Sequence, residues 1–194
     1  HSMLAYAGFL AGHKYVRDVM ADPVLSRLVA RHINAAGATL DPLDGVNFKE
    51  YAQTLLLRFS NPNIAHETYQ IAMDGSQKMP QRIFEPALVA LDRGSNGDPF
   101  AFAAACWIQY LSGAHITGES YELRDPRESE LSSACVAGGE DAYAVVSEIF
   151  ALADLVPLRL AKNIGFQKLV RKHLHVMRSS GMNAAITRAV TENG

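Results

Sequence analysis

Apolar residues recur with a period near 3.6 along almost the whole chain, which is the pattern of amphipathic helices. β-branched runs are scarce, and no stretch alternates apolar and polar residues as a half-buried strand does. Between positions 25 and 33, for example, Leu25, Leu28, Val29 and Ile33 form one apolar stripe. The pattern therefore predicts an all-α fold, a single domain of about nine or ten helices.

Capping residues and glycines mark the ends of these helices. Asp22-Pro23 and Asp98-Pro99 each place a capping side chain before a proline that suits the first helical turn. Asn47 begins a variant of the capping box. The polar residues 113–127 predict the longest loop. Glycines at positions 37, 113, 138 and 139 predict helix ends, and further helices are expected over 141–153, 164–178 and 183–191.

Pro80 interrupts an otherwise helical stretch that runs from about residue 67 to about residue 91. Proline lacks the N–H donor and clashes with the carbonyl four residues earlier. Either one helix ends near Lys78 and another begins at Pro80, or a single helix kinks there. The break is expected to leave residues 74–78 at a helix end, where polar groups can face a cleft.

The first residues are already apolar and periodic, although no capping residue precedes them. His1 stands directly before Met3, Leu4 and Tyr6. A helix that begins at the first residue predicts that the chain is a piece of a longer protein.

Composition and charge exclude several classes of protein. The chain has 194 residues, of which 48% are hydrophobic and 20% charged, so it is not a disordered chain. The formal net charge of −2 lacks the basic excess of a nucleic-acid-binding protein. The longest apolar run, 100–108, is shorter than the ~20 residues that span a bilayer. No signal peptide is visible. We expect a cytoplasmic protein with reduced Cys106 and Cys135 and with neither a membrane nor a nucleic-acid partner.

The sequence contains no self-sufficient catalytic motif. It has no GxSxG, GxGxxG or HExxH stretch. His173 and His175 are two residues apart and would point in different directions from a helix, which argues against a metal site. We predict that they belong to a basic, solvated face with Arg171, Lys172 and Arg178. The residues alone indicate only a soluble helical domain.

One polar face stands out. Gln70, Asp74, Lys78 and Gln81 follow at spacings of four, four and three, and would share a helix face with Arg82 beside them. Two cations, a carboxylate and two amides suit a carboxylated, polyhydroxylated small molecule. The alternative, favoured by the residues alone, is an exposed face with an Asp74–Lys78 ion pair worth a few tenths of a kcal/mol.

Gly75 lies in the middle of that stretch. Glycine costs up to about 1 kcal/mol inside a helix. We therefore expect Gly75 to allow the close approach of a ligand or of another helix.

Three segments carry a resemblance to a known family: HSMLAYAGFLAGH at 1–13, RFSNP at 58–62 and IAMDGSQK at 71–78. Together they resemble the C-terminal domain of the polyol-specific long-chain (mannitol) dehydrogenases. The last two segments are most similar to the branch that interconverts D-mannonate and D-fructuronate, the fructuronate reductases. The resemblance runs from residue 1 to about residue 180. It implies an all-helical domain like the C-terminal domain of 6-phosphogluconate dehydrogenase.

The resemblance also implies a division of labour. In the family, a Rossmann domain binds NAD, and a helical C-terminal domain closes over the substrate. Residues 1–194 would be that substrate-binding domain, and the N-terminal Rossmann domain would be absent from this chain. The family's metal-independent catalytic motif is Lys-x4-Asn-x2-His. His1 falls on its histidine, so the lysine and the asparagine would lie eight and three residues upstream, and this chain alone is expected to be inactive.

The family comparison assigns roles to the polar face. Lys78 matches a family lysine that contacts the substrate, and Gln70, Asp74 and Arg82 are the remaining substrate-binding candidates. The mannitol branch has arginine at the position of Gln70, so the D-mannonate branch is favoured. Whether Lys78, Arg82 or an upstream residue holds the carboxylate stays open. The alternatives are a mannitol 2-dehydrogenase or another polyol or ketouronate reductase, and a free-standing helical binding module without chemistry.

Overall fold

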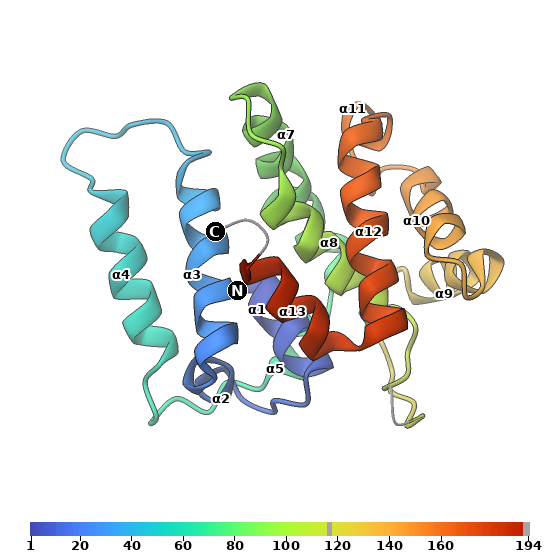
Figure 1. The fold of residues 1–194 in the computed structure, drawn as a ribbon, viewed down its shortest axis with the longest axis horizontal. Coiled ribbons are helices and arrows are strands. Elements are labelled where there is room, and N and C mark those ends of the chain that lie inside the picture. The colour runs from blue at the N-terminus through green and yellow to red at the C-terminus, as the bar shows by residue number, and fades with distance from the viewer. Residues whose placement is uncertain (116–117, 192–194) are drawn as a thin grey trace.

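The protein is helical throughout the residues that the computed structural model describes, 1–115 and 118–191 (Figure 1). Within these ranges, β-type pairing is limited to two isolated bridges, between Tyr15 and Glu67 and between Ala114 and Ser120. The all-α prediction is confirmed. The elements are α1 (Ser2–Leu10), α2 (Val16–Ala21), α3 (Pro23–Gly37), α4 (Phe48–Phe59), α5 (Thr68–Ala72), α6 (Gly75–Met79), the π-helix η1 (Pro80–Phe84), α7 (Glu85–Asp92), α8 (Asp98–Tyr110), α9 (Glu128–Gly138), α10 (Ala142–Ala151), α11 (Leu158–Ala161), α12 (Ile164–Ser180) and α13 (Met182–Thr191).

The described elements outnumber the nine or ten helices that the sequence predicted. The additional ones include α2, α5, α6 and α11, which have four to six residues each. A segment this short spans less than two helical turns, so it shows no complete apolar period. The longest helix, α12, has 17 residues. Along the described residues, we find no helix with the length and apolar character needed to cross a bilayer.

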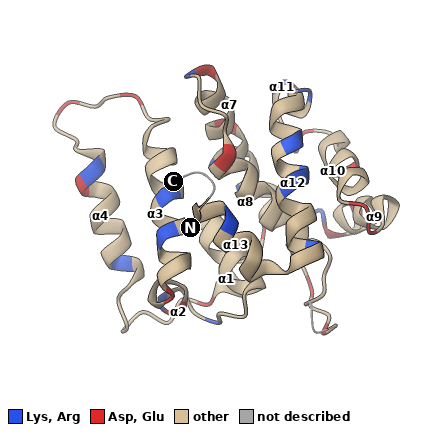
Figure 2. Cartoon of the chain, in the orientation of Figure 1, with Lys and Arg blue, Asp and Glu red and all other residues tan. Residues whose placement is uncertain are grey.

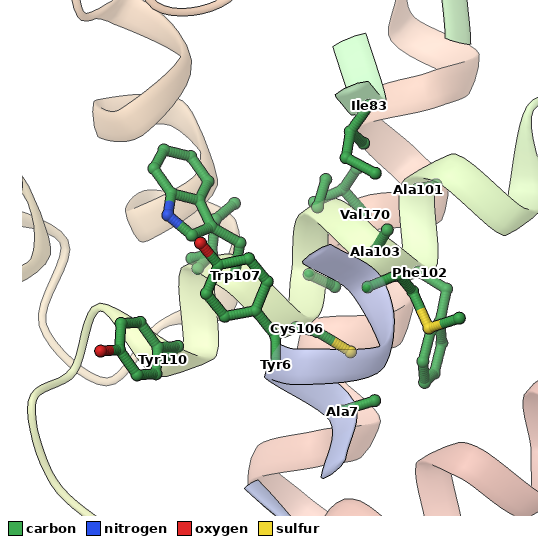
Figure 3. Close-up of a cluster of buried hydrophobic side chains, with 14 of the residues drawn as sticks. Tyr6, Ala7, Ile83, Ala101, Phe102, Ala103, Cys106, Trp107, Tyr110 and Val170 are labelled. Atoms are coloured by element: carbon green, nitrogen blue, oxygen red, sulfur yellow. The ribbon is translucent and has the colours of Figure 1, made fainter. Parts of the chain in front are cut away.

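Helix α8 forms the centre of the core. Eleven of its 13 residues are buried, and they include every residue from Phe100 to Ile108. A helix that is apolar all round must be enclosed by other helices, and α8 packs chiefly against α12 and α1. Figure 3 shows the resulting cluster, in which Tyr6 of α1 lies among side chains of α8 such as Trp107 and Tyr110.

Two helix pairs flank this centre. Helix α4 packs on α3 at one end of the molecule, and α9 packs on α10 at the other (Figure 1). Acidic and basic positions are spread over most of the helices and loops in the same view (Figure 2). Helix α4 is only lightly packed, because it contacts mainly α3 and α2 and buries only Ala52 and Phe59.

Most of the predicted helix ends are confirmed. The Asp22 carboxylate caps α3 by accepting hydrogen bonds from Val24 N (2.8 Å) and Leu25 N (3.0 Å). Asn47 caps α4, α9 ends at Gly138, and α10 begins after its cap Asp141. No helix lies between α8 and α9 in the described part of the predicted loop over 113–127, and positions 116 and 117 fall outside the described residues. Cys106 and Cys135 are free thiols.

The prediction that Asp98 caps a helix is wrong. Gly97 precedes α8, and Asp98 is the first helical residue. Its carboxylate is buried instead, where it accepts hydrogen bonds from Arg31 (2.7 Å) and pairs with the His173 ring (2.8 Å). Asp98 thereby joins α8 to α3 and α12. His173 is buried, so the prediction that it belongs to a solvated basic face is also wrong, whereas His175 is exposed.

The helical stretch around Pro80 is interrupted earlier than predicted. Met73 is extended (ψ 161°) and Asp74 is left-handed (φ 55°), which separates α5 from α6. From Gly75 onward the chain stays helical through α6, η1 and α7. The π-helix begins at Pro80, so the wider helical turn accommodates the missing donor there. Asp74 does lie at a helix end, as expected, but at the N-terminus of α6.

Candidate functional site

His1 lies directly before α1, and its ring rests on α4. The imidazole stacks on Phe59, with ring centroids 4.7 Å apart and an interplanar angle of 12°. The His66 ring lies 6.4 Å away at 54°. His1 itself is exposed. The stack therefore fixes the plane of the imidazole and leaves its edges accessible.

Arg82 connects η1 to the start of α1. Its guanidinium donates a hydrogen bond to Ser2 Oγ over 3.3 Å. The segments at 1–13, at 58–62 and just after 71–78, far apart in sequence, therefore meet around the first two residues. This convergence defines the candidate site.

Two hollows open on either side of His1. The larger, of about 440 Å³, lies between α3, α4 and the end of η1, and its lining includes Ser2, His32, Tyr51 and Arg82. The smaller, of about 270 Å³, is lined by His1, Val16, Leu55, Arg58, Phe59, Ile64 and His66. A third hollow, of about 390 Å³, lies beside the other end of α1 and contains none of the predicted site residues.

Lys78 is anchored beside the α5–α6 break. Its ammonium donates to Met73 O (2.6 Å) and Ile71 O (3.2 Å), and lies 3.9 Å from Asp74 Oδ2. Burial lowers the pKa of Lys78, the Asp74 carboxylate opposes that shift, and the Arg82 charge adds to it. Two of the three ammonium donors are used by backbone carbonyls, and the Asp74 carboxylate is the ion-pair partner of the same ammonium.

The prediction that the polar residues share one helix face is wrong. Gln70 is exposed on α5, whereas Asp74 lies in the break and Lys78 is on α6. Arg82 belongs to η1. The extended Met73 and the left-handed Asp74 reset the helical phase, so spacings of four no longer place residues on one face. The Asp74–Lys78 pair survives, because both residues belong to the turn that begins α6.

Gly75 allows a close approach, as predicted, and the partner is a helix. A Cβ atom at Gly75 would lie 2.4 Å from Trp107 Nε1 and 2.7 Å from the Tyr6 hydroxyl. The Tyr6 hydroxyl donates to Ala72 O over 3.0 Å. Figure 3 shows the Tyr6 and Trp107 side chains in this region. Gly75 therefore serves the packing of α6 on α1 and α8.

Three residues that contact or line the site had no predicted role. Arg58 and Phe59 belong to the RFSNP segment, which carried the resemblance without a stated function. His66 had no local signal, because its relation to His1 depends on tertiary packing. Among the described residues, no group of three His, Cys, Asp or Glu side chains is arranged to hold a metal ion.

Comparisons with known proteins agree on one family. The family described as "Mannitol dehydrogenase C-terminal domain" matches residues 1–169. D-Mannonate oxidoreductase of Escherichia coli is 34% identical over 160 residues, which cover 81% of this chain and 33% of that protein. Mannitol 2-dehydrogenase of Neosartorya fischeri is 36% identical over 148 residues, which cover 76% of this chain and 30% of that protein.

Solved structures give the same answer at the level of the fold. Pseudomonas fluorescens mannitol 2-dehydrogenase, in a ternary complex with NAD and D-mannitol, superposes with a TM-score of 0.90 at 25% identity, covering 98% of this chain and 39% of that chain. A substrate-free D-sorbitol dehydrogenase gives 0.82 at 25% identity, covering 96% and 38%. This chain spans about a third of the length of the curated relatives that it matches.

Proposed function

Because this chain belongs to the mannitol dehydrogenase C-terminal domain family, we propose that it is the substrate-binding domain of an NAD-dependent oxidoreductase. We propose that the whole protein interconverts D-mannonate and D-fructuronate by hydride transfer. The observation that carries this proposal is the convergence of residues 1–2, Phe59 and Arg82 around the exposed imidazole of His1.

The proposed role of His1 is to orient the reacting hydroxyl or carbonyl group of the substrate. Its ring plane is held by Phe59, and its free edge offers a nitrogen to the substrate hydroxyl or carbonyl. A hydrogen bond aimed at the oxygen where charge develops lowers the barrier, since the donor needs no reorientation during the reaction. The general base would be the lysine expected eight residues upstream of His1.

Lys78, Asp74, Gln70 and Arg82 are assigned the other hydroxyl groups of the substrate. The Lys78 ammonium is preorganised because two backbone carbonyls already hold it. Asp74 accepts hydrogen bonds, whereas Arg82 donates them and the Gln70 amide does both. Every proposed role is filled by a protein N–H group or carboxylate, so the proposal needs no metal ion.

The nicotinamide cofactor is assigned to the upstream part of the protein. Dinucleotides are held by a strand, a glycine-rich turn and a helix, and the described ranges of this chain do not fit that requirement, because their elements are all helical. Bound upstream, the nicotinamide would supply the acceptor for the hydride that leaves the substrate carbon. The residues of this chain bind and orient the substrate at His1.

Exposed apolar residues on and near α4 favour the presence of such an upstream domain. Leu43, Tyr51 and Leu57 are 60%, 58% and 74% exposed, although they lie on or just before a helix that also buries Phe59. Apolar residues on both sides of a helix indicate a second covering surface. A residue joined to His1 would emerge beside α4, because His1 stacks on Phe59. We propose that the Rossmann domain covers this face.

D-Mannitol is the second candidate substrate. The TM-score of 0.90 with a mannitol 2-dehydrogenase favours it. Gln70 weakens it, because the resemblance to the mannitol branch implies an arginine at that position.

The reading frame upstream of His1 gives the first test. We expect lysine eight residues before His1, asparagine three residues before it, and a glycine-rich strand–turn–helix further upstream. A reading frame that starts at His1 would contradict the proposal, and would indicate instead a helical module that binds a partner without chemistry.

A further inference from the structure

The smaller hollow beside His1 combines apolar walls with one cationic side chain, that of Arg58. Val16, Leu55, Phe59 and Ile64 supply the walls, while Arg58 and His66 stand beside His1. The lining residues include no aspartate or glutamate. The Arg58 guanidinium supplies a charge for an anion, and the imidazoles beside it can donate hydrogen bonds to the same anion. The hollow therefore has the chemistry of an anion site.

Within the described residues, no side chain competes for the Arg58 guanidinium. It belongs to the last turn of α4 and is exposed. In the part of the chain that the structure describes, its guanidinium makes no hydrogen bond or ion pair. By contrast, Arg82 is bonded to Ser2, and Lys78 is held by two carbonyls. Arg58 is thus the cation at this site whose donors are all available for a planar carboxylate.

His66 is placed by the backbone. Its carbonyl accepts a hydrogen bond from Val16 N over 3.0 Å, which ties the segment before α5 to α2. Its ring lies 6.4 Å from the His1 ring. In D-fructuronate, the ketone carbon and the carboxylate carbon are four C–C bonds apart, and four bonds of about 1.5 Å reach about 5 Å when extended. One substrate can therefore contact His1 at its reacting carbon and His66 at its carboxylate.

We infer that this hollow binds the carboxylate of a hexonate or ketouronate, with Arg58 as its ion-pair partner and His66 as a hydrogen-bond donor. The inference rests on the proposed function, because it takes His1 as the residue that holds the reacting group. A neutral polyol carries a CH₂OH group at this end and leaves Arg58 unpaired. Arg58 and His66 are therefore specificity-determining residues for sugar acids over polyols.

Equilibrium binding to the full-length protein, saturated with NADH so that the alcohol substrates bind without reacting, tests the inference. D-Mannonate and D-mannitol are titrated by calorimetry into the wild type, Arg58→Gln, His66→Gln and Lys49→Gln. Lys49→Gln is the matched control, because it removes one positive charge from the other end of the same helix. We expect Arg58→Gln to weaken D-mannonate binding about 10- to 100-fold, His66→Gln to weaken it less, and D-mannitol binding to change less than twofold in either. Lys49→Gln should leave both affinities unchanged.

A charge-preserving variant separates the carboxylate contact from a general disturbance of α4. Arg58→Lys should recover part of the D-mannonate affinity that Arg58→Gln loses. An ammonium still attracts the carboxylate, but it lacks the planar pair of N–H donors with which a guanidinium binds both carboxylate oxygens. Equal weakening of D-mannonate and D-mannitol in Arg58→Gln, or no weakening of either, overturns the inference. So does a wild type that binds D-mannitol more tightly than D-mannonate.

Turnover distinguishes this failure from failure of the proposed function. If the protein oxidises NADH with D-fructuronate while Arg58→Gln changes nothing, the proposed function stands and the carboxylate subsite falls. If the protein turns over no ketose or ketouronate but Arg58→Gln still abolishes preferential D-mannonate binding, the subsite stands and the proposed function falls.

Discussion

Asp98 is the buried carboxylate on which three helices depend. Burial raises its pKa, but the hydrogen bonds from His173 and Arg31 outweigh this effect and bring the pKa down to about 2. Arg31 also donates to Ala189 O over 2.7 Å, which extends the network to α13. A buried charge held in this way is costly to break, because its partners are left unsatisfied.

We predict that Asp98→Asn lowers the free energy of unfolding by about 2–4 kcal/mol, because it leaves the Arg31 charge without its carboxylate. Urea unfolding at pH 7 measures the change. Asp92→Asn is the control: Asp92 pairs with Arg159 at the surface, and its loss should cost at most about 1 kcal/mol. An equal loss of unfolding free energy in the two variants would show that the buried Asp98 network stabilises the protein no more than a surface ion pair does.

The same network predicts a pH dependence. The pKa of Asp98 is about 2 in the folded protein, below the value of about 3.9 for an unfolded aspartate. Its contribution to stability is therefore present above about pH 5 and is lost as the pH falls from 5 toward 2. Between these values, the wild type should lose about 2 kcal/mol more than Asp98→Asn. Parallel urea-unfolding profiles for the two proteins would contradict the assignment.

Local sequence patterns found the helix end near Asp98 and missed its role. An Asp-Pro pair has the local chemistry of a cap, whereas the partners of Asp98 lie 67 and 75 residues away. The Asp22-Pro23 pair has the same pattern and does cap its helix. Tertiary contacts decide whether the aspartate of an Asp-Pro pair caps its helix or is buried, and sequence periodicity does not reveal these contacts.

Among the elements, α6 shows most clearly how packing limits a side chain. We predict that Gly75→Ala destabilises the protein by about 1–3 kcal/mol, because its methyl group would overlap the Trp107 ring and the Tyr6 hydroxyl. Gly37→Ala is the matched control at the end of α3, where nothing lies within 4 Å of an added Cβ. That variant should be neutral or stabilising by up to about 1 kcal/mol. Thermal unfolding compares the two, and a stable Gly75→Ala would refute this packing.

The sequence predicted long helices better than short ones. Capped helices such as α3 and α4 show both a boundary signal and an apolar stripe. The break between α5 and α6 has no boundary signal in the sequence. The apolar spacing continues across Met73 and Asp74, although the helical backbone is interrupted there. A left-handed aspartate is allowed locally but is seldom required by the local sequence.

At the scale of the whole molecule, the exposed face of α4 is expected to become covered in the full-length protein. We predict that amide hydrogens of α4 exchange about tenfold or more slowly in the full-length protein than in the 194-residue chain. Amides of α9, at the opposite end, should exchange equally in both and serve as the internal control (Figure 1). Equal exchange of α4 in the two proteins would place the upstream domain elsewhere.

The resemblance assigned roles to His1 and Lys78 from short motifs, and these roles remain predictions. The shared helix face that the spacing predicted does not exist, because Met73 and Asp74 separate α5 from α6. Neither approach could place Phe59 or His66 against His1, because these contacts join segments that are more than 50 residues apart. Sequence periodicity predicts the helices but not how the chain arranges them in space.

Steady-state NADH oxidation with D-fructuronate tests the central claim, that His1 orients the substrate in a two-domain oxidoreductase. The full-length protein should be active, His1→Gln should lose about 100-fold or more in kcat, and the folded 194-residue chain alone should be inactive. His175→Gln, the same change at an exposed histidine on α12, should leave the rate unchanged. Full activity of His1→Gln, or turnover by the 194-residue chain alone, would contradict the account.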